Sequence, residues 1–221
     1  MATLDDASVG GAYLACLSAL AIWGWVEIAF LSGVIAGPNT RPLPANVSES
    51  ERFIRSWGTI AYHEMLLVAA LGLIAFAAWD APNGFGLWTF IILFFARISA
   101  KLNLFFGVPR IHVEFLPKPL AHVPSHFRVA TLNWVFPFSV TALAFAVACW
   151  MERIYAAETA ADAVGFTLLA TLTALALLEH WLMILPLPDE RLWRWMLPSS
   201  ETTTKTNHNK IPRPREDAHG L

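Results

Sequence analysis

The sequence predicts an all-α membrane protein with five transmembrane helices, and three observations support this prediction. Hydrophobic residues make up 56% of the 221 residues and charged residues only 14%, whereas a soluble domain carries about a quarter of its residues as charges. The chain holds ten tryptophans and fifteen phenylalanines, and its apolar residues gather into long runs. A net charge of −2 provides no overall basic field, which excludes nucleic acid as a partner and leaves membrane lipid as the expected surroundings.

Five runs are long enough to cross about 30 Å of hydrocarbon, which takes roughly 20 helical residues. The first and second runs cover residues 11–35 and 57–79, and they end before Gly37-Pro38 and before a turn sequence at 80–84. The third run covers 87–108 and ends at Pro109. The fourth and fifth runs cover 131–150 and 163–185, and Pro186 follows the fifth. Proline cannot continue a helix, so these joints separate the helices.

The distribution of lysine and arginine predicts the orientation. The segments after the first, third and fifth runs carry twelve of the fifteen basic residues, namely Arg41, Arg52, Arg55, Arg110, Lys118, Arg128, Arg191, Arg194, Lys205, Lys210, Arg213 and Arg215. The opposite side carries only Arg153. Because positively charged loops stay in the cytoplasm, we expect a periplasmic amino terminus and a cytoplasmic carboxyl terminus.

The end of the chain differs in composition from the rest. Residues 1–198 are expected to form the helical bundle, with a short helix near 189–196 that lies at the membrane interface because tryptophans alternate there with arginines. Residues 199–221 contain few apolar side chains, and we expect a disordered cytoplasmic tail.

Polar and ionisable residues inside the apolar runs are the candidate functional residues, because a charge in hydrocarbon is costly unless it is paired. Most of them fall at the same depth, in the cytoplasmic third of the bilayer. The predicted ligand-binding layer consists of Glu27, His63, Glu64, Arg97, Lys101, Asn103, Glu179 and His180, with Glu114 added by the loop after the third run. Around the stiff segment 116–119, this loop is expected to cover the cytoplasmic end of the bundle.

The spacing of these residues does not favour a metal site. His63-Glu64 and Glu179-His180 are adjacent pairs, and adjacent helical residues diverge by about 100°. We therefore predict no metal site of several ligands, although a single histidine could still bind the magnesium of a chlorophyll-type pigment or a haem iron. No catalytic motif appears, so the sequence favours a protein that is not an enzyme.

Several strings resemble the photosynthetic complex assembly family labelled PuhE, from purple bacteria. They cover nearly everything from the first run to Pro198, and the most specific are Arg97–Pro109 with Glu114–Pro117, Leu178–Trp181 with Leu185–Asp189 and Leu192–Trp195, and Trp23–Trp25 with Gly37-Pro38. Members of that family begin with two further spans, so this chain is expected either to be a shorter version or to start at a different codon.

The resemblance implies a multi-pass protein of the bacterial inner membrane, either cytoplasmic or intracytoplasmic. It implies an assembly factor for the photosynthetic reaction centre and core antenna, with subunits of these complexes and other assembly factors as partners. Bacteriochlorophyll or a precursor is the candidate ligand, and the cofactor stays open. Two alternatives also stay open: a membrane enzyme of tetrapyrrole or lipid metabolism, and a transporter of a small metabolite.

Overall fold

A computed structural model of the chain describes residues 3–111 and 116–185. Within these ranges the chain is helical, with no strand and one isolated bridge between Val108 and Val129. The five long helices are α1 (Val9–Leu31), α2 (Glu49–Ala77), α3 (Phe85–Phe106), α4 (Val135–Tyr155) and α5 (Ala160–Leu182). All five are long and apolar enough to cross a membrane, so the predicted fold class is confirmed. The expected interfacial helix and tail lie outside the described residues.

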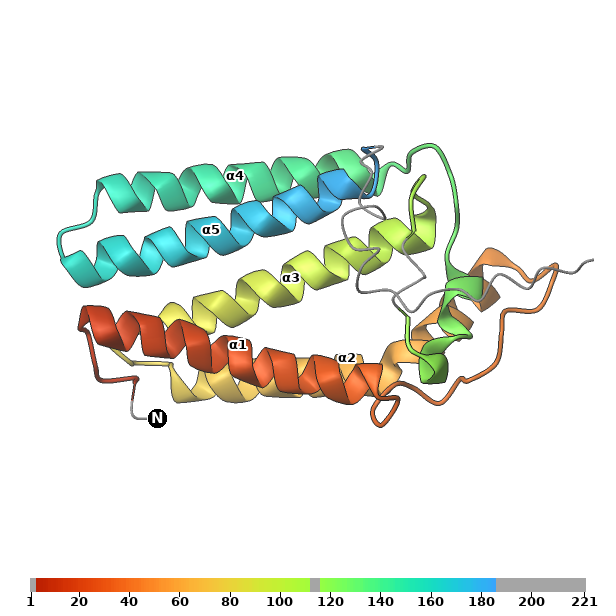
Figure 1. Ribbon diagram of the computed structural model, residues 1–221, viewed down its shortest axis with the longest axis horizontal. Helices are drawn as coiled ribbons and strands as arrows, with labels where there is room; N and C mark the ends of the chain where they lie inside the picture. The colour runs from red at the N-terminus through yellow and green to blue at the C-terminus, as the bar shows by residue number, and fades with distance from the viewer. Residues whose placement is uncertain (1–2, 112–115, 186–221) are drawn as a thin grey trace, which may run out of the picture. The chain divides into compact units, whose positions relative to one another are not determined.

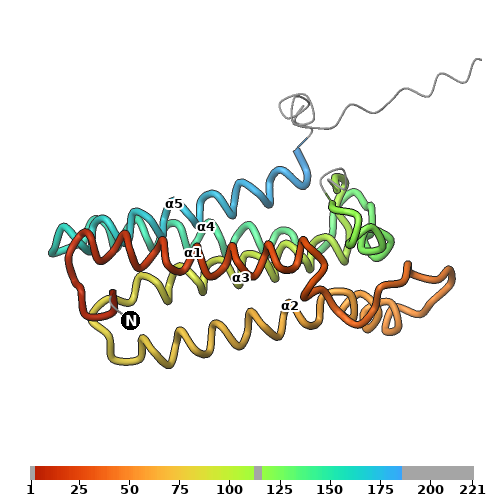
Figure 2. Tube along the Cα trace, turned by 60° about the horizontal axis from the view of Figure 1, so that its bottom comes forward, coloured from red at the N-terminus to blue at the C-terminus, as the bar shows by residue number. Residues whose placement is uncertain are grey.

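The helices pack as an antiparallel bundle in which α1, α3 and α5 run one way and α2 and α4 the other (Figure 1). Helix α5 contacts α4 most extensively and also packs against α1 and α3, while α2 lies on one side against α1 and α3 (Figure 2). Val26, Leu67 and Phe90 fill the centre of the α1–α2–α3 contact. The remaining faces are apolar and exposed, as expected where lipid is the solvent.

Helix α2 begins eight residues before the predicted run, because its first turns are polar. The Ser48 hydroxyl accepts a hydrogen bond from the amide of Glu51 at 3.2 Å, and this cap starts the helix. Arg52 is buried in the second turn; its guanidinium donates hydrogen bonds to the carbonyls of Phe105 and His126. The amino end of α2 is thereby fastened to the end of α3 and to the loop that follows.

The loop between α3 and α4 covers the ends of α1 and α2, as the sequence predicts. Two short 3₁₀ helices, η1 (Lys118–Leu120) and η2 (Val123–His126), lie in this loop. Leu120 and Val123 pack against Phe30 and Ala36, beyond which the chain continues to α2.

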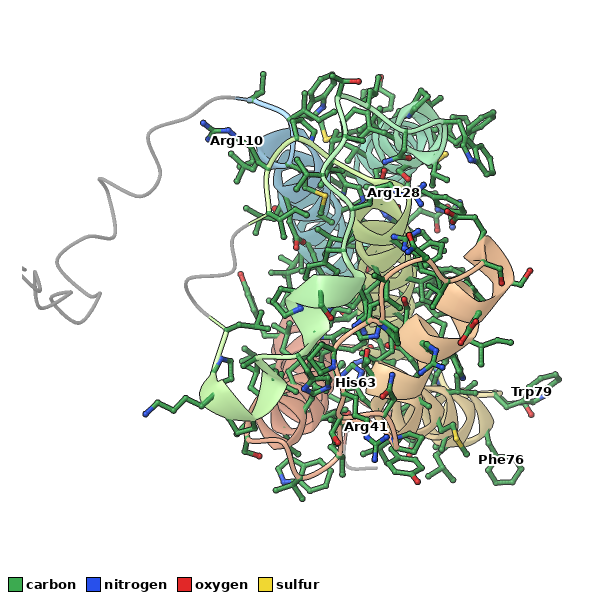
Figure 3. The ribbon with its side chains drawn as sticks, turned by 90° about the vertical axis from the view of Figure 1, so that its right-hand side faces the viewer. Arg41, His63, Phe76, Trp79, Arg110 and Arg128 are labelled. Atoms are coloured by element: carbon green, nitrogen blue, oxygen red, sulfur yellow. The ribbon has the colours of Figure 1, made fainter. Side chains whose placement is uncertain are left out.

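The basic loops lie at one end of the bundle. Arg41, Arg128 and Lys118 belong to loops at the end where α1 and α3 finish, and Arg153 lies at the other end of α4. Figure 3 looks onto the basic end, with His63 between the helices and the exposed Phe76 and Trp79 pointing away from the bundle.

Candidate functional site

Five ionisable side chains from three helices meet inside the bundle. Glu27 comes from α1, His63 and Glu64 from α2, and Arg97 and Lys101 from α3. We call this set the charged cluster. Arg97 and Lys101 are four residues apart and therefore share one face of α3. This face meets the last turns of α1, which carry Glu27, and the middle of α2, which carries Glu64, so the bundle brings opposite charges together.

His63 lies at the centre of the charged cluster and is fully buried. Its Nδ1 atom is 3.2 Å from Glu64 Oε1, and its Nε2 atom is 3.6 Å from Glu27 Oε1. The imidazole also packs against the Phe30 ring, with the centroids 4.5 Å apart. One imidazole is thus placed between two carboxylates from different helices.

Each carboxylate of the charged cluster has its own cation. Arg97 donates to Glu27 Oε2 at 3.3 Å, and Lys101 donates to Glu64 Oε1. Lys101 Nζ also lies 3.4 Å from His63 Nδ1. Two negative and two positive charges therefore balance around His63, which offsets the cost of holding them inside hydrocarbon.

Each nitrogen of His63 faces one of the two carboxylates. With its proton on Nδ1, His63 donates to Glu64. With its proton on Nε2, the N–H faces Glu27, and Nδ1 accepts from Lys101. The two neutral tautomers differ only in which carboxylate receives the N–H. Glu27 Oε1 and His63 Nε2 are both buried without a hydrogen-bond partner, so a small approach between them would complete the path from Glu27 to Glu64.

Asn103 and His180 form part of a separate network on another face of α3. Residues 99 and 103 are rotated by about 200° from 97 and 101, at about 100° per residue. Asn103 Nδ2 donates to Ser139 Oγ of α4 at 2.9 Å, and Ser99 Oγ lies 2.9 Å from His180 Nε2 of α5. The layer expected from the sequence therefore divides into two sites, because shared depth does not imply a shared face.

This second network, which we call the polar clamp, consists of Ser99, Asn103, Asn133, Ser139 and His180. His180 Nδ1 donates to the Ala176 carbonyl at 2.8 Å, so Nε2 is the acceptor for the Ser99 hydroxyl. Asn133 Nδ2 donates to Asn103 Oδ1 and to the Gly107 carbonyl. Its Oδ1 accepts from the amides of Val135 and Phe136. The polar clamp therefore caps α4 and ties α3, α4 and α5 together.

The sequence analysis missed Ser99, Asn133 and Ser139. Small hydroxyls are ordinary in membrane helices, and Asn133 stands at a helix start where a cap is common. A signal was present in the spacing: Ser99 and Asn103 are four residues apart, as are Arg97 and Lys101, so α3 presents two polar faces.

Glu179 belongs to neither network. Its side chain is exposed and lines a cavity of about 370 Å³ between α1, α3 and α5, together with Glu27 and Arg97. The apolar part of the cavity includes Trp23 of α1 and Leu175 of α5. Glu114 lies outside the described residues, so its expected place in the layer stays a prediction.

The family described as "Protein of unknown function (DUF3623)" matches residues 1–204. A protein of Rhodobacter capsulatus named "Uncharacterized 30.4 kDa protein in puhA 5'region" is 59% identical over 208 residues, which cover 94% of this chain and 76% of that protein. No solved structure matches the chain.

Proposed function

The chain belongs to the DUF3623 family, and we propose that it is an integral membrane assembly factor for the photosynthetic reaction centre and its core antenna. The observation that carries this proposal is the 59% identity with the Rhodobacter capsulatus protein, whose name places it in the 5' region of puhA. The resemblance of the sequence to the PuhE assembly family supports the same role.

The architecture suits contact with other membrane subunits. Helix α4 buries only Phe136 and Ser139, and the outer face of α2 carries exposed side chains such as Met65 and Phe76. Within the bilayer, such faces meet either lipid or the helices of a partner. Reaction-centre subunits, antenna subunits and other assembly factors are the partners of the proposal.

We place the basic end of the bundle in the cytoplasm, because the loops with Arg41 and Arg128 lie there and Arg153 lies opposite. The membrane is then the bacterial inner membrane or its intracytoplasmic extension. In this orientation the charged cluster and the polar clamp lie in the half of the bilayer nearer the cytoplasm.

Bacteriochlorophyll or a precursor is the ligand that the resemblance implies. His63 and His180 are fully buried, and both nitrogens of His180 are already hydrogen-bonded. Magnesium ligation by His180 would require the Ser99 hydrogen bond to break. That the two histidines bind the magnesium of the pigment therefore stays a prediction. An absorption spectrum of protein extracted gently from phototrophic cells tests it directly.

Deletion and complementation test the assembly role. In the bacterium that encodes this chain, deletion should lower the absorbance of the reaction centre and core antenna several-fold, while the transcripts of their subunits and total pigment synthesis continue. The wild-type gene on a plasmid should restore the complexes. Unchanged levels of both complexes in the deletion strain would contradict the proposal.

The position of His63 between Glu27 and Glu64 favours one second candidate, a membrane enzyme of tetrapyrrole or lipid metabolism that transfers a proton. The same deletion strain separates the two functions. Loss of an enzyme would cause its substrate to accumulate in the membrane extract, whereas loss of an assembly factor would leave intermediates at their normal level. Stoichiometric iron in the purified protein would also favour the enzyme.

A further inference from the structure

The cavity between α1, α3 and α5 is polar at one end and apolar at the other. On each helix the ionisable residue is the lining residue nearest the helix's carboxyl end: Glu27 follows Trp23, Arg97 follows Ile92, Leu93 and Ala96, and Glu179 follows Leu172, Leu175 and Ala176. Because the three helices run in the same direction (Figure 1), the charged residues lie toward one membrane surface and the apolar residues toward the bilayer centre. A lipid in the leaflet at that surface is arranged in the same way, with its polar head group toward the surface and its acyl chains toward the bilayer centre.

The polar end of the cavity has two groups without a partner. Arg97 donates one N–H to Glu27, but its Nε atom is buried and has no hydrogen-bond partner. Among the described residues, Glu179 has no ion pair or hydrogen bond, although it lines the same cavity. The Arg97 side chain is still 36% exposed, so its guanidinium has N–H groups left to donate. The polar end of the cavity therefore offers donors from Arg97 and an acceptor from Glu179.

The charges at the cavity define the head group that fits. Two carboxylates and one guanidinium line it, so ionised Glu179 leaves one uncompensated negative charge. A purely anionic head would be repelled by Glu179, and a head without N–H groups could not donate to it. A zwitterion with a phosphate for Arg97 and an ammonium for Glu179 satisfies both groups.

The geometry points to a binding site for a zwitterionic amine phospholipid of the phosphatidylethanolamine class in the α1–α3–α5 cavity. The phosphate accepts from Arg97, the ammonium donates to Glu179, and one acyl chain lies along Trp23 and Leu175. The volume of about 370 Å³ lies near the lower end of small-molecule sites, about 300–1,000 Å³, and suits part of one lipid. This inference does not depend on the proposed assembly role.

Native mass spectrometry of the purified full-length protein tests the site. Palmitoyl-oleoyl phosphatidylethanolamine, phosphatidylcholine and phosphatidylglycerol are added in detergent at equal concentration. We expect the ethanolamine lipid to give the most bound protein and the glycerol lipid the least. Glu179→Gln should lower the preference for ethanolamine over choline about tenfold, because a charge-assisted hydrogen bond is lost. Glu152→Gln, an exposed carboxylate at the other end of the bundle, should leave the preference unchanged.

A pair of substitutions on α5 tests the tail position. Leu175→Trp fills the apolar part of the cavity, whereas Leu178→Trp adds the same bulk at an exposed position that does not line it. Leu175→Trp should reduce lipid binding several-fold and Leu178→Trp should not. Equal binding of the three lipids by the wild type, or equal binding by the two tryptophan variants, would overturn the inference.

Discussion

The Nε2 atom of His63 lies 3.6 Å from Oε1 of Glu27, and neither of these buried atoms has a hydrogen-bond partner among the described residues. On its other side His63 contacts Glu64 directly. A buried polar atom without a hydrogen-bond partner is rare in proteins and points to a role beyond packing. We therefore expect substitutions in the charged cluster to affect function. Substitutions there and in the polar clamp also test what stabilises the bundle.

Replacing His63 and His180 with alanine should lower the yield of photosynthetic complexes, because these substitutions remove the buried imidazole of each network. The amount of this protein in the membrane should stay the same. Absorption spectra of membranes, normalised to the protein level on immunoblots, measure the effect. Tyr62→Ala with Leu178→Ala, which changes exposed residues on the same two helices, is the matched control and should leave the spectra unchanged.

Lys101→Met should destabilise the bundle strongly. It removes the cation that pairs with Glu64, whose side chain is only 5% exposed. Leaving a buried charge without its partner costs about 3–5 kcal/mol, which thermal unfolding in detergent would report as a large fall in Tm. The double variant Lys101→Met with Glu64→Gln should regain most of this loss. A double variant as unstable as the single one would contradict the pairing.

Ser99→Ala should weaken the polar clamp. The hydroxyl donates to His180 Nε2 at 2.9 Å, and without it a fully buried acceptor is unsatisfied, at a cost of about 1–3 kcal/mol. Thr171→Ala removes an exposed hydroxyl on α5 that bonds only to the Thr167 carbonyl, and should change stability by less than about 0.5 kcal/mol. Chemical unfolding of both variants in the same detergent gives the comparison.

The loop between α3 and α4 should make stability depend on pH through His126. Burial keeps the pKa of His126 below its usual 6.5, and the charges of the nearby His122 and Arg52 act in the same direction, whereas the hydrogen bond to the His122 carbonyl opposes them. The unfolded chain therefore takes up the proton first, so this contribution to stability is complete above pH 6.5 and decreases as the pH falls through the window below 6.5.

His126→Gln should flatten that part of the pH profile. Tm values for wild type and variant between pH 5 and pH 8 make the test. At neutral pH the Tm of the wild type should be higher by the packing that the variant loses, and this difference should shrink as the pH falls below 6.5, because only the wild type loses stability there. Parallel curves throughout the range would show that His126 does not titrate as its burial requires.

The five helices could be predicted from the sequence because hydrocarbon imposes length and composition on every span. The ends of the helices could be predicted less accurately. Helix α2 begins at Glu49 rather than at residue 57, because its first turns are polar and are held by Ser48 and Arg52 rather than by hydropathy. Helix α4 begins at Val135 and not at 131, because the Asn133 side chain accepts hydrogen bonds from the amides of Val135 and Phe136, just before the N-cap residue Trp134.

The sequence predicts the level along the bundle at which the candidate residues lie, but not the helix face that each of them occupies. Glu27, His63 and Lys101 do meet, because opposite charges in hydrocarbon must pair. Asn103 and His180 share their depth yet join α4 and α5 instead. Which face of α3 each helix meets depends on side-chain packing over the whole bundle, and hydropathy and spacing carry no such information.

The contacts of Arg52 have a consequence for biosynthesis. Its guanidinium holds carbonyls that stand 53 and 74 positions later in the chain, so the ribosome must finish the third helix and the following loop before this arginine finds its acceptors. Until then the amino end of α2 lacks both of these hydrogen bonds. The start of the second helix is therefore fixed only after the third helix and its loop have been synthesised.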